Sequence, residues 1–122
     1  MPTEPQPLTL AAAARRAAEA CDPVDADDAV ADLLRRLEDR DEPITGVAGL
    51  DQQLAEIQGA VDPQDEDPAV VMMVAVIMHL AHRRDEVGAD DSRLLQQAAR
   101  DEFDGQPPEH VREWLEARGV EL

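Results

Sequence analysis

The sequence of 122 residues contains no lysine and no tyrosine, a single cysteine, and two aromatic residues, Phe103 and Trp114. Because lysine is absent, arginine carries all of the positive side-chain charge. Cys21 alone cannot form an internal disulfide, and its alanine-rich surroundings favour a small buried thiol. With so few aromatic residues, the core must be built from Ala, Val, Leu, Ile and Met. This composition favours close-packed helices over a sheet.

Two kinds of targeting segment are also missing. The amino terminus lacks the basic region and the long apolar region of a secretory signal. The longest uninterrupted apolar run, residues 69–78, is shorter than the roughly 20 residues that cross a membrane. Together with the lone cysteine, which suits a reducing compartment, these features predict a cytoplasmic protein.

The charge is strongly one-sided, with a formal net value of -17. Such a surface repels phosphate backbones and anionic lipid headgroups, so we expect neither nucleic acid nor a membrane as the direct partner. This acidic, lysine-free pattern resembles that of salt-adapted proteins. At molar salt the Debye length falls to about 3 Å, so the repulsion between the protein's own acidic side chains is screened. There are two alternative explanations of the acidity: the composition of a GC-rich genome, or an acidic face that binds a basic partner. The acids are spread along the whole chain, which favours salt adaptation.

The positions of proline, glycine and aspartate divide the chain into helices. Residues 1–7 hold three prolines and no apolar periodicity, which predicts a disordered tail before a single helical domain over residues 8–122. The expected helices cover residues 8–21, 23–39, 50–61, 68–84, 90–103 and 107–118. Asp22 with Pro23, and Asp67 with Pro68, are expected to start the second and fourth of them. No internal repeat is apparent in the sequence.

The helix expected at about residues 68–84 is apolar on every side for nearly three turns. Such a helix must be surrounded, either by the other helices of its own chain or by a second subunit. We therefore predict an all-α fold, a five- or six-helix bundle around this central helix. Its three methionines, Met72, Met73 and Met78, are adaptable side chains.

If part of the apolar surface is uncovered, the candidate partner contacts are Met72, Met73, Met78 and Trp114, since methionine adapts to varied surfaces and tryptophan is favoured at interface centres. Ordinary core positions are the alternative for each of them. We expect a protein partner or self-association, for example as a homodimer.

The carboxyl-terminal third, residues 90–122, resembles the helix-turn-helix part of a winged helix. Two short helices are joined by a turn, and the second ends in Gly-Val-Glu-Leu. This resemblance implies a DNA-associated regulator as an alternative function. The helix that would enter the groove carries Glu109, Glu113 and Glu116, which suit phosphate contacts poorly. A plain helical hairpin is the alternative for this segment.

His79 and His82 lie three residues apart on one expected helix face, with Glu86 a turn further along. Such spacing can chelate a metal, but the sequence identifies no further ligand. Metal binding is therefore a second alternative, and polar residues at the exit of an apolar helix are the simpler explanation. No motif indicates a catalytic group or a cofactor. The sequence favours a non-enzymatic interaction or regulatory module.

Overall fold

The computed structural model describes residues 7–122, and the regular structure of this part of the chain is helical. Its elements are α1 (Leu10–Cys21), α2 (Asp28–Leu37), the 3-10 turn η1 (Ile44–Gly46), α3 (Leu50–Val61), α4 (Pro68–His82), the 3-10 turn η2 (Arg84–Gly88), α5 (Asp91–Phe103) and α6 (Glu109–Ala117). The predicted all-α class is confirmed. The tail expected at residues 1–7 falls, except for Pro7, outside the described residues.

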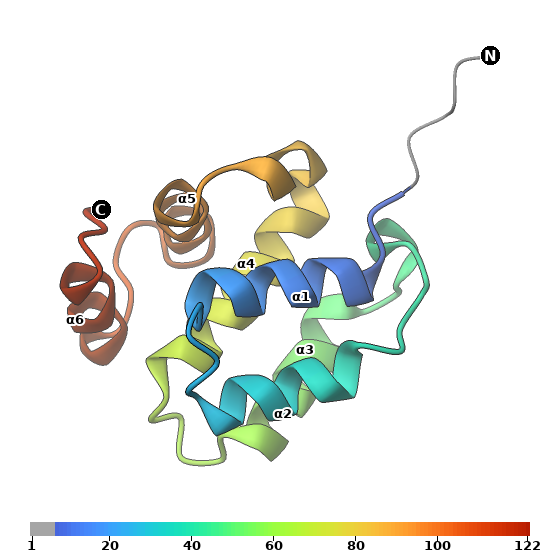
Figure 1. The fold of residues 1–122 in the computed structure, drawn as a ribbon, viewed down its shortest axis with the longest axis horizontal. Helices are drawn as coiled ribbons and strands as arrows, with labels where there is room; N and C mark the ends of the chain where they lie inside the picture. The colour runs from blue at the N-terminus through green and yellow to red at the C-terminus, as the bar shows by residue number, and fades with distance from the viewer. Residues whose placement is uncertain (1–6) are drawn as a thin grey trace.

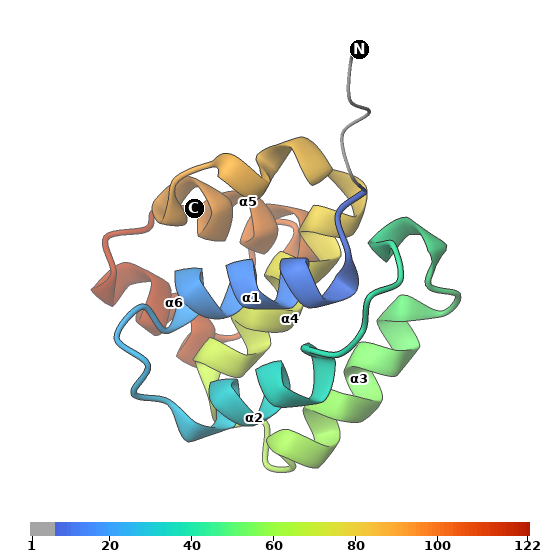
Figure 2. The same ribbon diagram turned by 45° about the vertical axis from the view of Figure 1, so that its right-hand side comes forward.

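The apolar helix α4 lies at the centre of the fold and contacts every other α-helix. Figures 1 and 2 show α1 and α4 between α2 and α3 on one side and α5 and α6 on the other. The chain itself therefore surrounds α4, without a second subunit. The buried residues of α4 are Ala69, Val70, Val71, Met72, Met73, Ala75, Val76, Ile77, His79 and Leu80.

The second helix begins later than predicted, whereas the other helix limits lie within two residues of the prediction. The second helix begins at Asp28 rather than at Pro23, because Asp27 is the residue whose carboxylate accepts from the amides of the first turn. Asp22 instead ends α1, with its backbone N–H bonded to Ala18. The fourth helix ends at His82 rather than near residue 84, because Arg83 leaves the helical conformation and η2 follows.

The hairpin of α1 and α2 recurs as the hairpin of α3 and α4 at a shift of 40 positions. Helices α1 and α3 begin at Leu10 and Leu50, and each is 12 residues long. The identical pairs are Leu10 and Leu50, Ala20 and Ala60, Asp22 and Asp62, Pro23 and Pro63, Asp25 and Asp65, Asp27 and Asp67, Ala29 and Ala69, and Val30 and Val70. The shared Asp-Pro-x-Asp-x-Asp loop is the clearest part of this repeat.

The two loops have the same hydrogen bonds. In the first loop, the Asp22 carboxylate accepts from the backbone N–H of Ala26 at 3.0 Å and of Asp27 at 2.8 Å. The carboxylate of Asp62 accepts from the two equivalent amides of the second loop, at 3.2 and 3.0 Å. The second aspartate of each loop, Asp25 or Asp65, has a φ of 53°, in the left-handed region that Asp and Asn tolerate better than most residues.

The packing of the hairpins follows a local two-fold relation. Helix α1 packs against α4, as α3 packs against α2, and each hairpin is also packed within itself. The aspartates that cap α2 and α4 meet where these helices begin. The repeat was not apparent in the sequence because the identical residues are concentrated in one loop, whereas the outer faces of the helices have diverged.

Arg16, on α1, links the two hairpins to the segment that leads into α5. Its guanidinium donates to the carbonyl oxygens of Val87 at 2.9 Å and Ala89 at 2.7 Å, and pairs with Asp91 at 2.9 Å. The side chain is only 15% exposed. One planar cation thus satisfies two backbone acceptors beside η2 and one carboxylate in the first turn of α5, a geometry that lysine cannot reproduce.

We predict that Arg16→Met lowers the free energy of unfolding by about 2–3 kcal/mol, because it removes charge-assisted bonds and leaves their acceptors without a donor. Arg16→Lys should restore less than half of this loss. The matched control is Arg15→Met, at an exposed site, with an expected change within about 0.5 kcal/mol. Denaturant unfolding at fixed high salt measures all three, and equal losses for the two methionine variants would contradict this role of Arg16.

Candidate functional site

An open groove of about 470 Å³ runs between α1 and α2, and we call it the α1–α2 groove. Its apolar lining consists of Ala18, Val30, Ala31 and Leu34. Its charged lining consists of Arg15, Glu19, Asp22, Asp25, Arg35 and Glu38. An apolar floor with a charged rim is the usual construction of a site that binds a protein segment.

At two positions of the groove, small side chains leave space that larger ones could fill. Ala18 is buried in α1, and Ala31 on α2 is partly exposed. At the equivalent positions of the second hairpin, the larger Gln58 and Val71 are present. The loop at one end of the groove also holds Val24, which is 79% exposed. Apolar surface is therefore accessible both in the groove and beside it.

The second hairpin has an equivalent groove, the α3–α4 groove. Its lining from the hairpin is Gln58, Asp65, Val71, Val74 and Ala75. Each of these residues lies 40 positions after a residue of the α1–α2 groove, namely Ala18, Asp25, Ala31, Leu34 and Arg35. The correspondence shows that the two grooves are the same feature of the repeat.

Unlike its counterpart, the α3–α4 groove is covered by the chain itself. Glu102 and Phe103, at the end of α5, and Pro108, before α6, complete its lining. The space that remains open is about 200 Å³. Phe103 is partly buried and packs against the core. One of two equivalent grooves is thus occupied in cis, and the other is open.

The rim of the α1–α2 groove is predominantly acidic. Arg35 is paired with Asp32 on its own helix at 3.6 Å. Among the described residues, no ion pair joins Glu19, Asp25 or Glu38 to an arginine. These three exposed carboxylates give the rim a negative potential that no neighbouring cation neutralises directly.

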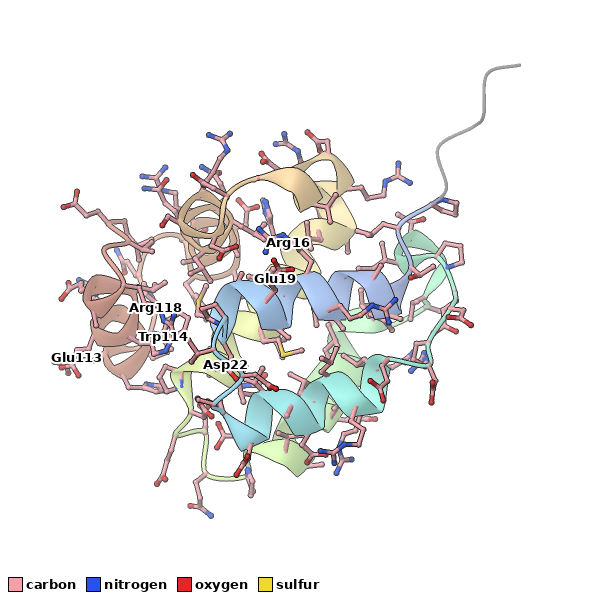
Figure 3. The ribbon with its side chains drawn as sticks, in the orientation of Figure 1. Arg16, Glu19, Asp22, Glu113, Trp114 and Arg118 are labelled. Carbon is pink, nitrogen blue, oxygen red and sulfur yellow. The ribbon has the colours of Figure 1, made fainter. Side chains whose placement is uncertain are left out.

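Trp114 lies near the end of α1 that holds Asp22. Figure 3 shows Trp114 and Arg118 on the side of α6 that faces this end of α1, whereas Glu113 points away from it. The Arg118 guanidinium lies over the Trp114 ring, 4.1 Å from its centroid. The ring is half-buried between its own helix and this cation. Trp114 therefore keeps some of the exposure that a partner contact requires.

The three methionines proposed as partner contacts lie in different environments. Met72 and Met73 are fully buried, so the condition on which they were proposed, an uncovered apolar surface, is not met for them. They fill the core between α4 and its neighbours. Met78 is partly exposed and lines another open pocket, of about 470 Å³, with Val47 and Leu50. Of these candidates, only Met78 and Trp114 remain accessible.

The residues considered for metal binding are engaged separately. The Nδ1 atom of the buried His79 lies 2.5 Å from the Asp101 carboxylate, and its Nε2 atom is buried. Glu86 forms ion pairs with Arg83 and Arg93, and His82 is exposed. Within residues 7–122, no group of three or more His, Cys, Asp or Glu side chains is placed to hold a metal ion.

Cys21 is fully buried at the end of α1, as its alanine-rich surroundings predicted. Burial raises the pKa of its thiol far above the usual range, because the low-dielectric core disfavours the thiolate. The thiol is therefore a packing group and not a nucleophile.

The capping carboxylates of the two hairpins share one electrostatic environment. Burial, and then the hydrogen bond and negative charge of Asp27, raise the pKa of Asp67 to about 6. The bond from the Ala69 amide opposes this shift. A proton shared between the two side chains would therefore hold the starts of α2 and α4 together at mildly acidic pH.

Sequence reasoning did not find the α1–α2 groove. The signal was present as the repeated Asp-Pro-x-Asp-x-Asp loop, which aligns the hairpins and so aligns α2 with α4. At that alignment the polar Arg35 and Arg36 correspond to the buried Ala75 and Val76. The difference indicates that one hairpin is covered by the rest of the chain and the other is not.

We predict that Asp67→Asn makes the protein more stable relative to wild type as the pH rises through about 6. Above that pH the native chain holds two repelling carboxylates at this contact, and below it the native chain binds a proton that the unfolded chain does not. Allowing for solvent screening, the difference should change by about 1 kcal/mol between pH 5 and 7.5. Unfolding at several pH values measures it. Asp65→Asn controls for charge loss in the same loop, and a pH-independent difference for Asp67→Asn would refute the shared proton.

We also predict that Phe103→Ala lowers the free energy of unfolding by about 2 kcal/mol, because it removes the side chain that covers the α3–α4 groove from a partly buried site. Val24→Ala removes apolar atoms from an exposed site and should change stability by less than about 0.5 kcal/mol. Thermal and denaturant unfolding compare the two variants. If Phe103→Ala were as mild as Val24→Ala, the α3–α4 groove would not be filled as described.

The comparisons with known proteins leave the fold and the groove as the basis for any functional assignment. In residues 7–122, no helix combines the length and the apolar character that a membrane crossing requires. No protein-family model matches the chain, and neither a curated protein nor a solved structure does.

Proposed function

We propose that this chain is a non-enzymatic protein-interaction module that binds a protein partner, or a second copy of itself, through the α1–α2 groove. The observation that carries this proposal is the pair of equivalent grooves. The chain covers the α3–α4 groove with Phe103 and Pro108, but leaves the α1–α2 groove open. A groove that can accept protein side chains in one hairpin supports the same use in the other.

The compartment we propose is a cytoplasm at high salt. The net charge of -17 and the absence of lysine support it, as does a single cysteine that is kept reduced and buried. At molar salt, long-range attraction between this surface and a cation is screened, so a stable interface needs apolar contact as well. The floor of the α1–α2 groove offers that contact.

The contacts of the residues concerned support neither of the two alternative functions, DNA binding and metal binding. Helices α5 and α6 each pack on α4, with fewer contacts between the two, unlike the directly packed helices of a helix-turn-helix unit. The acidic residues Glu109, Glu113 and Glu116 of α6 are exposed. His79 and Glu86 are engaged with Asp101 and with arginines. We therefore propose neither DNA binding nor metal binding.

The test introduces a charge into the floor of the groove. Ala31→Glu should lower recovery of the partner at least tenfold when the protein is isolated from its own cells at native salt, because a carboxylate would be buried at the interface. Ala55→Glu, the same change at an exposed site on α3, is the matched control. Circular dichroism establishes that both variants are folded, and sedimentation of the purified protein measures self-association.

The proposal expects either a partner protein or a dimer that Ala31→Glu removes and Ala55→Glu retains. Equal recovery of the same proteins with all three chains, combined with a purified wild-type protein that sediments as a monomer at high concentration, would refute it.

A further inference from the structure

We infer that the occupant of the α1–α2 groove is a segment of a different protein, in which one bulky apolar or aromatic side chain is flanked by arginine or lysine. This inference rests on the proposed function and names the chemistry of the partner. The apolar side chain would lie against Ala31 and Leu34, and the basic side chains against the acidic rim.

The way in which Phe103 fills the α3–α4 groove indicates what kind of apolar side chain fits the α1–α2 groove. There, Phe103 lies at the end of a helix and shares the groove with Val71 and Val74. These two valines are the repeat equivalents of Ala31 and Leu34. The open groove has smaller side chains at Ala18 and Ala31 and larger ones at Leu34 and Arg35 than their equivalents, so its room for an aromatic ring is judged from its open volume. The open volumes, about 470 Å³ against 200 Å³, agree with one missing occupant.

The rims of the two grooves differ in charge, and this difference indicates which residues flank the apolar side chain of the occupant. The hairpin side of the α3–α4 groove contributes Gln58 and one acid, Asp65, and it accepts a segment that itself contains Glu102. The α1–α2 groove has Glu19, Asp22, Asp25 and Glu38 on its rim against two arginines. An acidic segment would be repelled there, and a basic one would be attracted.

The same charge argument disfavours a second copy of this chain as the occupant. The chain has 28 acidic residues against 11 basic ones, and the segment around its own Phe103 is Arg-Asp-Glu-Phe-Asp. A segment with this charge would bring further carboxylates against the acidic rim. A different protein with basic residues beside an aromatic one is the better electrostatic match.

The test uses a peptide built on the segment that fills the α3–α4 groove. The probe is residues 97–108 with Asp101→Gln, Glu102→Arg and Asp104→Arg, which keeps Phe103 as the anchor and makes its flanks basic. A second peptide adds Phe103→Ala, and a third is the unchanged acidic segment. Each is titrated into the full chain, at the lowest salt that maintains the fold, while NMR follows the amide and methyl signals of Ala31 and Leu34.

We expect the basic peptide with Phe103 to shift the signals of Ala31 and Leu34 and to bind about 10- to 100-fold more tightly than the peptide with Phe103→Ala, because the ring contributes apolar burial. The acidic peptide should not bind measurably. Ala31→Glu in the protein should abolish these shifts, and Ala55→Glu should leave them unchanged.

Two results would overturn the inference. If both basic peptides bind equally, or if the shifts spread over the surface, the attraction is a general effect of the acidic chain and the groove does not select an aromatic anchor. If the signals of Ala31 and Leu34 instead move on dilution of the protein alone, a second copy occupies the groove.

The inference and the proposed function can fail separately. If no basic peptide binds but Ala31→Glu still removes a natural partner, the groove is an interface and the inferred occupant is wrong. If Ala31→Glu removes no partner and no peptide binds, both are wrong.

Discussion

The burial of α4 determines how the other helices are arranged. Ten of its 15 residues are buried, and they lie on all sides of its first three turns, so the chain must surround it. Helices α1, α2 and α3 cover part of its surface, and α5 and α6 cover the remainder. The same coverage brings Phe103 and Pro108 over the α3–α4 groove. The filling of one groove is therefore a consequence of the burial of the central helix.

The first hairpin has no comparable constraint, and its sequence differs from that of the second hairpin at most positions. Helix α2 keeps the inward positions Val30, Leu33 and Leu37 buried, as their equivalents in α4 are, but has charged residues on its outer face. The two hairpins thus share one core, but α5 and α6 cover the second hairpin and leave the outer face of α2 exposed. The α1–α2 groove persists because nothing in the described chain covers it, and its acidic rim keeps it compatible with water at high salt.

The sequence was sufficient for the helical class and for the central place of α4, because these depend on apolar periodicity, on alanine content and on the Asp67–Pro68 start signal. It misplaced the start of α2, because Pro23 lies in a loop that only the bonds of Asp22 define. It could not place Met72 and Met73, since their burial depends on how all the other helices surround α4. The α1–α2 groove was missed because it lies between two helices. No local sequence pattern indicates how two helices pack or where a space is left between their side chains.

Nuclear Overhauser effects from the aromatic rings can measure the difference in occupancy between the two equivalent grooves. The chain has one phenylalanine and one tryptophan, so each ring signal has an unambiguous source. If only the α3–α4 groove is filled, we expect cross-peaks from the Phe103 ring to the methyl groups of Val71 or Val74, and none from either ring to Ala31 or Leu34. Cross-peaks to Ala31 or Leu34, or none to either valine, would contradict this difference in occupancy.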